Sequence, residues 1–212
     1  MNNHIPAWER TRDLGPLTGF FVTVRETLTR PRDFFEGLSA EGPWERVLGF
    51  WALTSLPPMA AAGVSAHRFV QRIPELAQVD PASVPFHVPW WVFTIAGPLL
   101  QFLGLLFGLA LVHLVLRLLG GGEEGWTGSL RAAGYASSPA LLGFIPVAGG
   151  LIGGLWAALL QYYALLRVHR EHPGRLLLAY LLPVLLFAVV GTLVAAASLR
   201  FLAPRMEGML PF

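Results

Sequence analysis

The chain has 212 residues, of which 54% are hydrophobic and only 13% are charged. Soluble proteins carry about 25% charged residues, so this composition excludes an ordinary soluble enzyme and an intrinsically disordered chain. The sequence contains no cysteine, which excludes disulfide bonds, thiolate metal sites and thiol nucleophiles. All fifteen basic residues are arginines, and because they do not cluster on one soluble face we expect no nucleic-acid partner.

The N-terminal part begins with a polar tail over residues 1–16, followed by an amphipathic segment over residues 17–38. Apolar side chains recur in this segment at helical spacing, with arginine and glutamate largely on the other side. We expect one or two interfacial helices on the inner membrane face, or alternatively a short helix packed beneath the membrane spans. The apolar side chains in question are Phe20, Phe21, Val24 and Leu28.

Four charge-free runs of 21 to 36 residues follow. A membrane-spanning helix needs about 20 apolar residues, and continuous apolar runs are typical of helices rather than barrel strands. The third run, residues 132–166, is too long for one crossing and has Pro146 and glycines near its middle. It therefore predicts two short helices, or alternatively one kinked crossing or a re-entrant hairpin. The five predicted spans are 45–65, 90–117, 131–148, 151–167 and 176–199, before a C-terminal tail over 201–212.

The arginines favour an orientation. With five crossings and the N-terminus inside, eleven of the fifteen arginines lie on the inner side, as the positive-inside rule requires. With four crossings the inner side holds ten, so the rule favours a cytoplasmic N-terminus more strongly than it favours either number of crossings.

Glycines four residues apart allow helix backbones to approach closely within a membrane. We expect these pairs to pack helices within one subunit, and the first pair is also a candidate contact between two copies of the chain. The three pairs are Gly104 with Gly108, Gly149 with Gly153, and Gly150 with Gly154.

Three polar residues lie inside predicted spans, namely Gln101, His113 and Gln161. We expect hydrogen bonds between helices, although an ionisable residue such as His113 is also a functional candidate. A serine hydrolase formed by Ser65 and His113 is a weaker hypothesis, because the two residues lie toward opposite ends of neighbouring spans. The His-Arg-Glu-His sequence at 169–172 lacks the HExxH pattern of zinc proteases and favours contact with anionic lipid head groups.

The stretch from Gly134 reads GYASSPALLGFIPVAGGLIGGLWAALLQYYALLRVHR, in which Tyr135 opens a kinked helix and Pro139 and Pro146 precede a glycine-rich turn. Together with PRDFFEGL before the first span, it resembles the Yip1-domain family of five-span membrane proteins in its bacterial form. The resemblance covers residues 17–200 and implies a membrane protein whose role is unsettled. Because the residues form no catalytic constellation, we expect no catalytic, cofactor or metal site.

The sequence therefore predicts an all-α, polytopic helical bundle in the bacterial inner membrane. The expected role is a non-enzymatic scaffold or interaction partner, whose partners are membrane lipids, other membrane proteins or a second copy of the chain. A small transporter or channel component that uses the kinked spans is the alternative, and an intramembrane hydrolase is less favoured.

Overall fold

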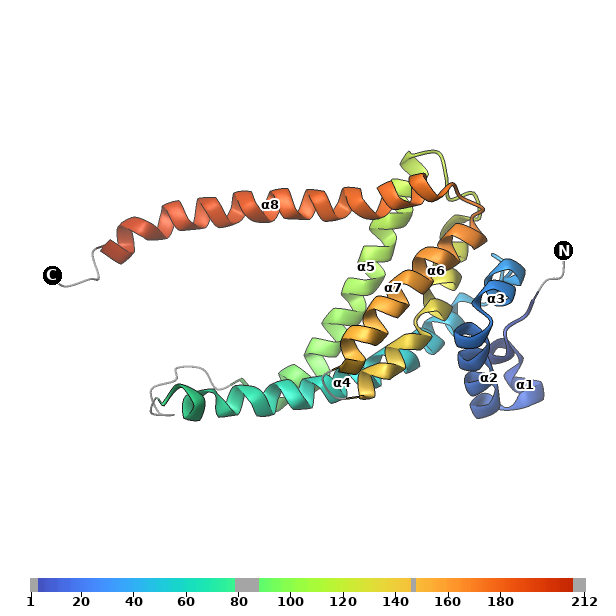
Figure 1. Cartoon of the computed structure of the whole chain (residues 1–212), viewed down its shortest axis with the longest axis horizontal. Helices are drawn as coiled ribbons and strands as arrows, with labels where there is room; N and C mark the ends of the chain where they lie inside the picture. The colour runs from blue at the N-terminus through green and yellow to red at the C-terminus, as the bar shows by residue number, and fades with distance from the viewer. Residues whose placement is uncertain (1–3, 79–87, 146–147, 208–212) are drawn as a thin grey trace.

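The computed structural model describes residues 4–78, 88–145 and 148–207, and these residues form helices and no strand (Figure 1). The elements are η1 (Ala7–Arg10), α1 (Thr11–Leu14), α2 (Pro16–Thr29), α3 (Pro31–Gly37), α4 (Trp44–Ala77), η3 (Val92–Ala96), α5 (Gly97–Leu118), α6 (Gly125–Ala136), η4 (Ser138–Phe144), α7 (Ala148–Val168) and α8 (Pro173–Glu207). The all-α prediction is confirmed.

Four of the described helical segments are long and apolar enough to cross a membrane. They account for the apolar composition of the chain and confirm a polytopic membrane bundle. These segments are Trp44–Pro74, Val92–Leu118, Ala148–Val168 and Pro173–Leu193.

The segment predicted as a span over 131–148 is not one continuous α-helix. Helix α6 ends at Ala136, and the 3₁₀-helix η4 follows it. Two serine hydroxyls bond back to the α6 backbone here: Ser137 Oγ donates to Gly134 O at 2.6 Å and Ser138 Oγ donates to Tyr135 O at 3.0 Å. Pro139 then lacks the N–H group that would continue the helix. Together α6 and η4 still extend about 30 Å, so the segment has the length of one crossing.

Contacts between glycines and neighbouring helices fix the direction of each pass. Gly134 lies against Val47 and Gly143 lies against Pro58, so α6 and η4 run parallel to α4. A Cβ at Gly153 would stand 2.5 Å from the carbonyl oxygen of Pro139, which is the close approach of an antiparallel hairpin between η4 and α7.

Helix α5 runs antiparallel to α4. The rings of Trp51 in the first part of α4 and Phe102 of α5 lie 5.6 Å apart. Further along α4, Gly63 lies against the backbone of Phe93 in η3, which precedes α5. Helices α4, α5, α6 with η4, and α7 therefore run up and down along one another. The N-terminal helices and the far part of α8 lie at opposite ends of the molecule (Figure 1).

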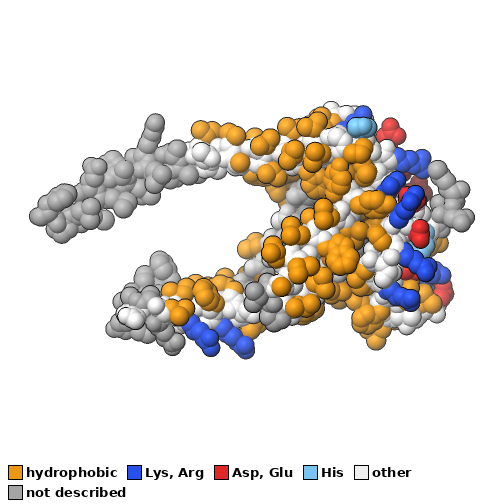
Figure 2. All heavy atoms as spheres, in the orientation of Figure 1, with side chains coloured by type: hydrophobic (Ala, Val, Ile, Leu, Met, Phe, Trp, Pro, Cys, Tyr) orange, Lys and Arg blue, Asp and Glu red, His pale blue; other side chains and the backbone are white. Residues whose placement is uncertain are grey.

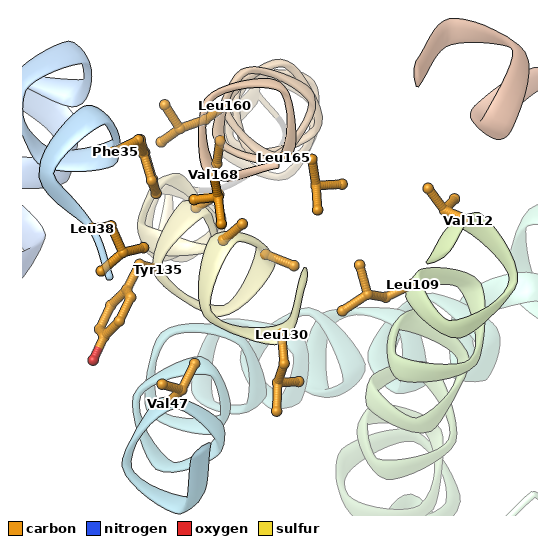
Figure 3. Packing of buried hydrophobic residues seen from close by; sticks show 14 of the residues in the cluster. Phe35, Leu38, Val47, Leu109, Val112, Leu130, Tyr135, Leu160, Leu165 and Val168 are labelled. Atoms are coloured by element: carbon orange, nitrogen blue, oxygen red, sulfur yellow. The ribbon is translucent and has the colours of Figure 1, made fainter. Parts of the chain in front are cut away.

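The buried core lies at the end of the bundle that carries the N-terminal helices. Leu130 and Tyr135 of α6 stand at its centre, between side chains of α3, α4, α5 and α7 (Figure 3). Phe34 and Phe35 of α3 are both buried there. The N-terminal helices thus pack against the bundle, in agreement with the second of the two interpretations left open by the sequence.

The most buried positions of α2 are small or hydroxyl residues that lie beside its apolar stripe, where Phe20 and Val24 are partly buried against the core. Gly19, Thr23 and Thr27 are buried, whereas Phe21 is 65% exposed. The reason is a close approach by η1, since a Cβ at Gly19 would stand 2.8 Å from the carbonyl oxygen of Ala7. Thr27 Oγ1 also donates a hydrogen bond of 2.7 Å to Ser138 Oγ on η4.

Helix α8 leaves the bundle after its first turns. Its side chains from Leu181 to Leu193 are exposed apart from Pro183. The last part of α4 also extends away from the rest of the bundle, so that the two helices project as separate arms, and the α4 arm carries exposed arginines (Figures 1 and 2).

Candidate functional site

A cavity of about 330 Å³ lies between α4, α5, η4 and α7. Most of its wall comes from alanine and glycine, including Ala140 on η4 and Gly150, Gly154 and Ala157 on α7. A Cβ placed at Gly150 or Gly154 would meet no atom within 4 Å. These small residues leave room beside α7, and we call this space the amide cavity because two glutamine amides also line it.

Gln101 on α5 and Gln161 on α7 are the two glutamines. The structure thus brings together two of the three polar residues that the sequence predicts within spans. Within the part of the chain that the structure describes, neither amide has a hydrogen-bond partner. The nearby hydroxyl of Ser137 differs, because it bonds to Gly134 O and lies 2.6 Å from Thr54 Oγ1. The cavity therefore presents two unpaired donor-and-acceptor groups.

The glycine pairs divide into two kinds. Gly149 and Gly153 face η4, where they lie against the carbonyl oxygens of Leu142 and Pro139. Gly150 and Gly154 face the amide cavity, and Pro146 lies outside the described residues.

The remaining pair, Gly104 and Gly108 on α5, has nothing within 4 Å of either Cβ position. This pair packs against no other helix within the described residues. It has the same four-residue spacing as Gly149 and Gly153 on α7, which do pack against η4.

His113 lies at the other end of α5 and belongs to a separate polar cluster. Its Nδ1 atom is 2.8 Å from Ser129 Oγ on α6, and the same hydroxyl is 2.8 Å from Nε2 of His169. One serine hydroxyl thus links α5, α6 and the segment after α7.

The structure holds Ser65 and His113 apart. Ser65 lies in the far half of α4, where its hydroxyl donates to Ala61 O. The neighbouring Gly63 lies against Phe93, and the twenty residues from Phe93 to His113 cover about 30 Å of helix. The two residues do not form a nucleophile and base.

His169 is buried, with 3% of its surface exposed. Burial lowers the pKa of its ring to about 4, the nearby His113 ring acts in the same direction, and Glu171 opposes both. Glu171 accepts a 2.7 Å hydrogen bond from the backbone of Gly122 and pairs with Arg175. Among the described residues, no group of three or more metal-binding side chains gathers. This buried ring holds helices together rather than facing lipid head groups.

The sequence did not indicate a buried ionic cluster at the N-terminus. Arg131 of α6 is 1% exposed and lies 2.7 Å from the carboxylate of Glu9, to which Tyr135 also donates a 2.6 Å hydrogen bond. Glu9 belongs to the stretch that composition describes as a polar tail. The only signal in the sequence was an arginine directly before the charge-free run of residues 132–166, and an arginine at that place is also typical of a loop.

Comparison with known proteins identifies the fold family. The family model for the Yip1 domain matches residues 25–196. No curated protein and no solved structure matches the chain. The matched residues include every helix from α4 to α7 and the part of α8 up to residue 196. The predicted resemblance to the Yip1-domain family is confirmed, and the chain belongs to the Yip1 domain family.

Proposed function

We propose that this Yip1-family membrane protein is a non-enzymatic scaffold that binds another membrane protein through α5. The observation that carries the proposal is the open Gly104–Gly108 pair, which has no packing partner within the described residues. Helices in lipid associate by close packing at small residues, because lipid tails remove the hydrophobic driving force between them. An uncovered pair of this kind suits a helix from outside the chain.

Large apolar residues surround the pair on the same exposed face. Leu100, Leu103 and Phe107 are each more than half exposed, and their spacing repeats at three and four residues around Gly104. This arrangement provides a small-residue notch between large side chains, into which the side chains of a partner helix pack.

The non-enzymatic part of the proposal is supported by the separation of Ser65 from His113, which removes the serine-and-base pair suggested by the sequence. The proposed location is the bacterial inner membrane with a cytoplasmic N-terminus. Charged side chains gather at the end of the molecule that carries the N-terminal helices (Figure 2), which agrees with an excess of arginine on the inner side.

The test places a photoreactive amino acid at Phe107 in the full chain within native membranes. The proposal predicts one reproducible crosslinked protein of different mass, whose yield falls in Gly104→Leu. Gly191→Leu on α8 is the matched control, because that glycine is also open, and it should leave the yield unchanged. Crosslinks to lipid or to a second copy alone would contradict the proposal, as would equal yields in both variants.

A further inference from the structure

The amide cavity has a property that the bundle itself does not explain. Gln101 and Gln161 both line it from segments that are apolar enough to cross a membrane, yet neither amide has a hydrogen-bond partner among the described residues. An amide that loses water without gaining another partner destabilises the protein. Gln101 is exposed and Gln161 is half-buried, so within a membrane these amides face lipid tails, which offer no hydrogen bonds. A bound molecule with a polar head would supply the missing hydrogen bonds.

We infer that the amide cavity binds a neutral, lipid-soluble small molecule through hydrogen bonds to Gln101 and Gln161. The head of this ligand carries a hydroxyl, ester or amide group, because a carboxamide both donates and accepts. Its apolar part lies along the alanine and glycine wall formed by η4 and α7.

The charge of the lining residues decides the charge of the ligand. All of the residues that line the cavity are uncharged, including Ser55, Met59 and Leu105 beside the two amides. A charged group at this position would lose its hydration without gaining a counter-ion. Fatty acids and phospholipid head groups are therefore excluded in favour of neutral heads.

The volume decides the size of the ligand. About 330 Å³ lies at the lower end of the range for small-molecule sites. A whole helix is about 10 Å wide and does not enter such a space. The cavity accommodates a polar head and the first part of one acyl chain, while the remainder of the chain extends toward the lipid.

The experiment uses the purified full-length protein in lipid nanodiscs and two photoreactive probes. One is a monoacylglycerol that carries a diazirine near its head, and the other is a fatty acid with the same chain and diazirine. We expect saturable labelling of α5 or α7 peptides by the monoacylglycerol, competed by unlabelled monoacylglycerol. Labelling by the fatty acid should be weak and should not saturate.

Two kinds of variant test the site. Gln101→Leu and Gln161→Leu each remove hydrogen bonds, and each should weaken the apparent affinity about threefold to tenfold. Gly154→Leu fills the cavity from its wall and should abolish saturable labelling. Gly191→Leu adds the same side chain at an open glycine of α8 and should leave labelling unchanged.

The proposal fails if labelling does not saturate, if both probes label equally, or if Gly154→Leu labels as the unmodified protein does. Absence of labelling also overturns it and points to water as the occupant. A Cβ at Gly154 has no atom within 4 Å, so we expect Gly154→Leu to fold. This variant therefore still tests the cavity if a glutamine variant fails to fold. The Gly154 and Gln161 variants lie on α7, so their readouts test the amide cavity separately from the partner-binding face of α5.

Discussion

The guanidinium group of Arg131 lies 2.7 Å from the carboxylate of Glu9, with 1% and 7% of the two side chains exposed. Arg131 Nε also donates a 2.8 Å hydrogen bond to the carbonyl oxygen of Ser39. One side chain on α6 therefore holds both η1 and the segment between α3 and α4. This pair joins residues 122 positions apart and fixes the N-terminal helices on the bundle.

Arg131→Met should destabilise the protein by about 3–5 kcal/mol, because it leaves the buried Glu9 carboxylate without its counter-charge. Unfolding in detergent, followed by tryptophan fluorescence, measures the effect, since Trp8 packs beside this cluster and donates to Arg46 O.

The control is Arg32→Met, because Arg32 pairs with Glu36 at the surface, where its side chain is 76% exposed. That variant should lose no more than about 1 kcal/mol. Equal losses in the two variants would show that the buried pair does not hold the N-terminal helices.

The pH dependence of stability should depend on His169. Its pKa is lowered from 6.5 to about 4 in the folded chain, chiefly by burial. The unfolded chain therefore binds a proton more readily between these values, so acidification favours unfolding. Stability should fall as the pH decreases from about 6.5 toward 4 and should be fully retained above that window.

His169→Gln should reduce this pH dependence, measured as the unfolding midpoint in detergent at pH 7.5 and pH 4.5. The matched change His172→Gln, three residues away, affects an exposed ring and should retain the original pH dependence. The readout is the change of the unfolding midpoint between the two pH values. The midpoint at a single pH is not used, because His169→Gln also alters the bond to Ser129. An unchanged slope would rule out His169 as the titrating group.

Neighbouring glycines on α7 should respond in opposite ways to the same substitution. In Gly153→Ala the new methyl group stands 2.5 Å from the carbonyl oxygen of Pro139, so η4 and α7 must separate. The expected loss is about 1–3 kcal/mol. Gly154→Ala meets nothing within 4 Å and should match or slightly exceed the stability of the unmodified chain, since alanine favours helix. Thermal unfolding of both variants tests this prediction. Similar unfolding midpoints in the two variants would contradict the close packing of η4 against α7.

The general architecture could be predicted from the sequence because it depends on local composition. Long apolar runs without charge specify helices within a membrane wherever they occur. The long run from residue 132 to 166 could likewise be divided, because proline and glycine weaken a helix through their own backbone chemistry.

The contacts between helices could not be predicted in this way, since they depend on residues far apart in the chain. Sequence spacing treats Gly104 and Gly149 alike, but only Gly149 meets another helix within the described residues. Similarly, Arg131 has the position of a loop arginine in the sequence, whereas Glu9 and Ser39 make its burial favourable. Periodicity identifies α2 as a helix, and Phe20 and Val24 as side chains that pack on the core. It does not indicate the burial of Gly19, which follows the close approach of η1.

The number of crossings is the last prediction, and the absence of cysteine makes it directly testable. Single variants Arg72→Cys, Glu123→Cys and Arg205→Cys report on the far part of α4, the turn before α6 and the last part of α8. If residues 132–166 cross twice, the cysteines at 72 and 205 lie on the same side, and the cysteine at 123 lies on the other. An impermeant maleimide should then label positions 72 and 205 in intact cells, and position 123 only after the membrane is opened. The length of α6 with η4, about 30 Å, favours this outcome. Labelling of position 205 on the same side as position 123 would instead require that residues 132–166 cross the membrane once.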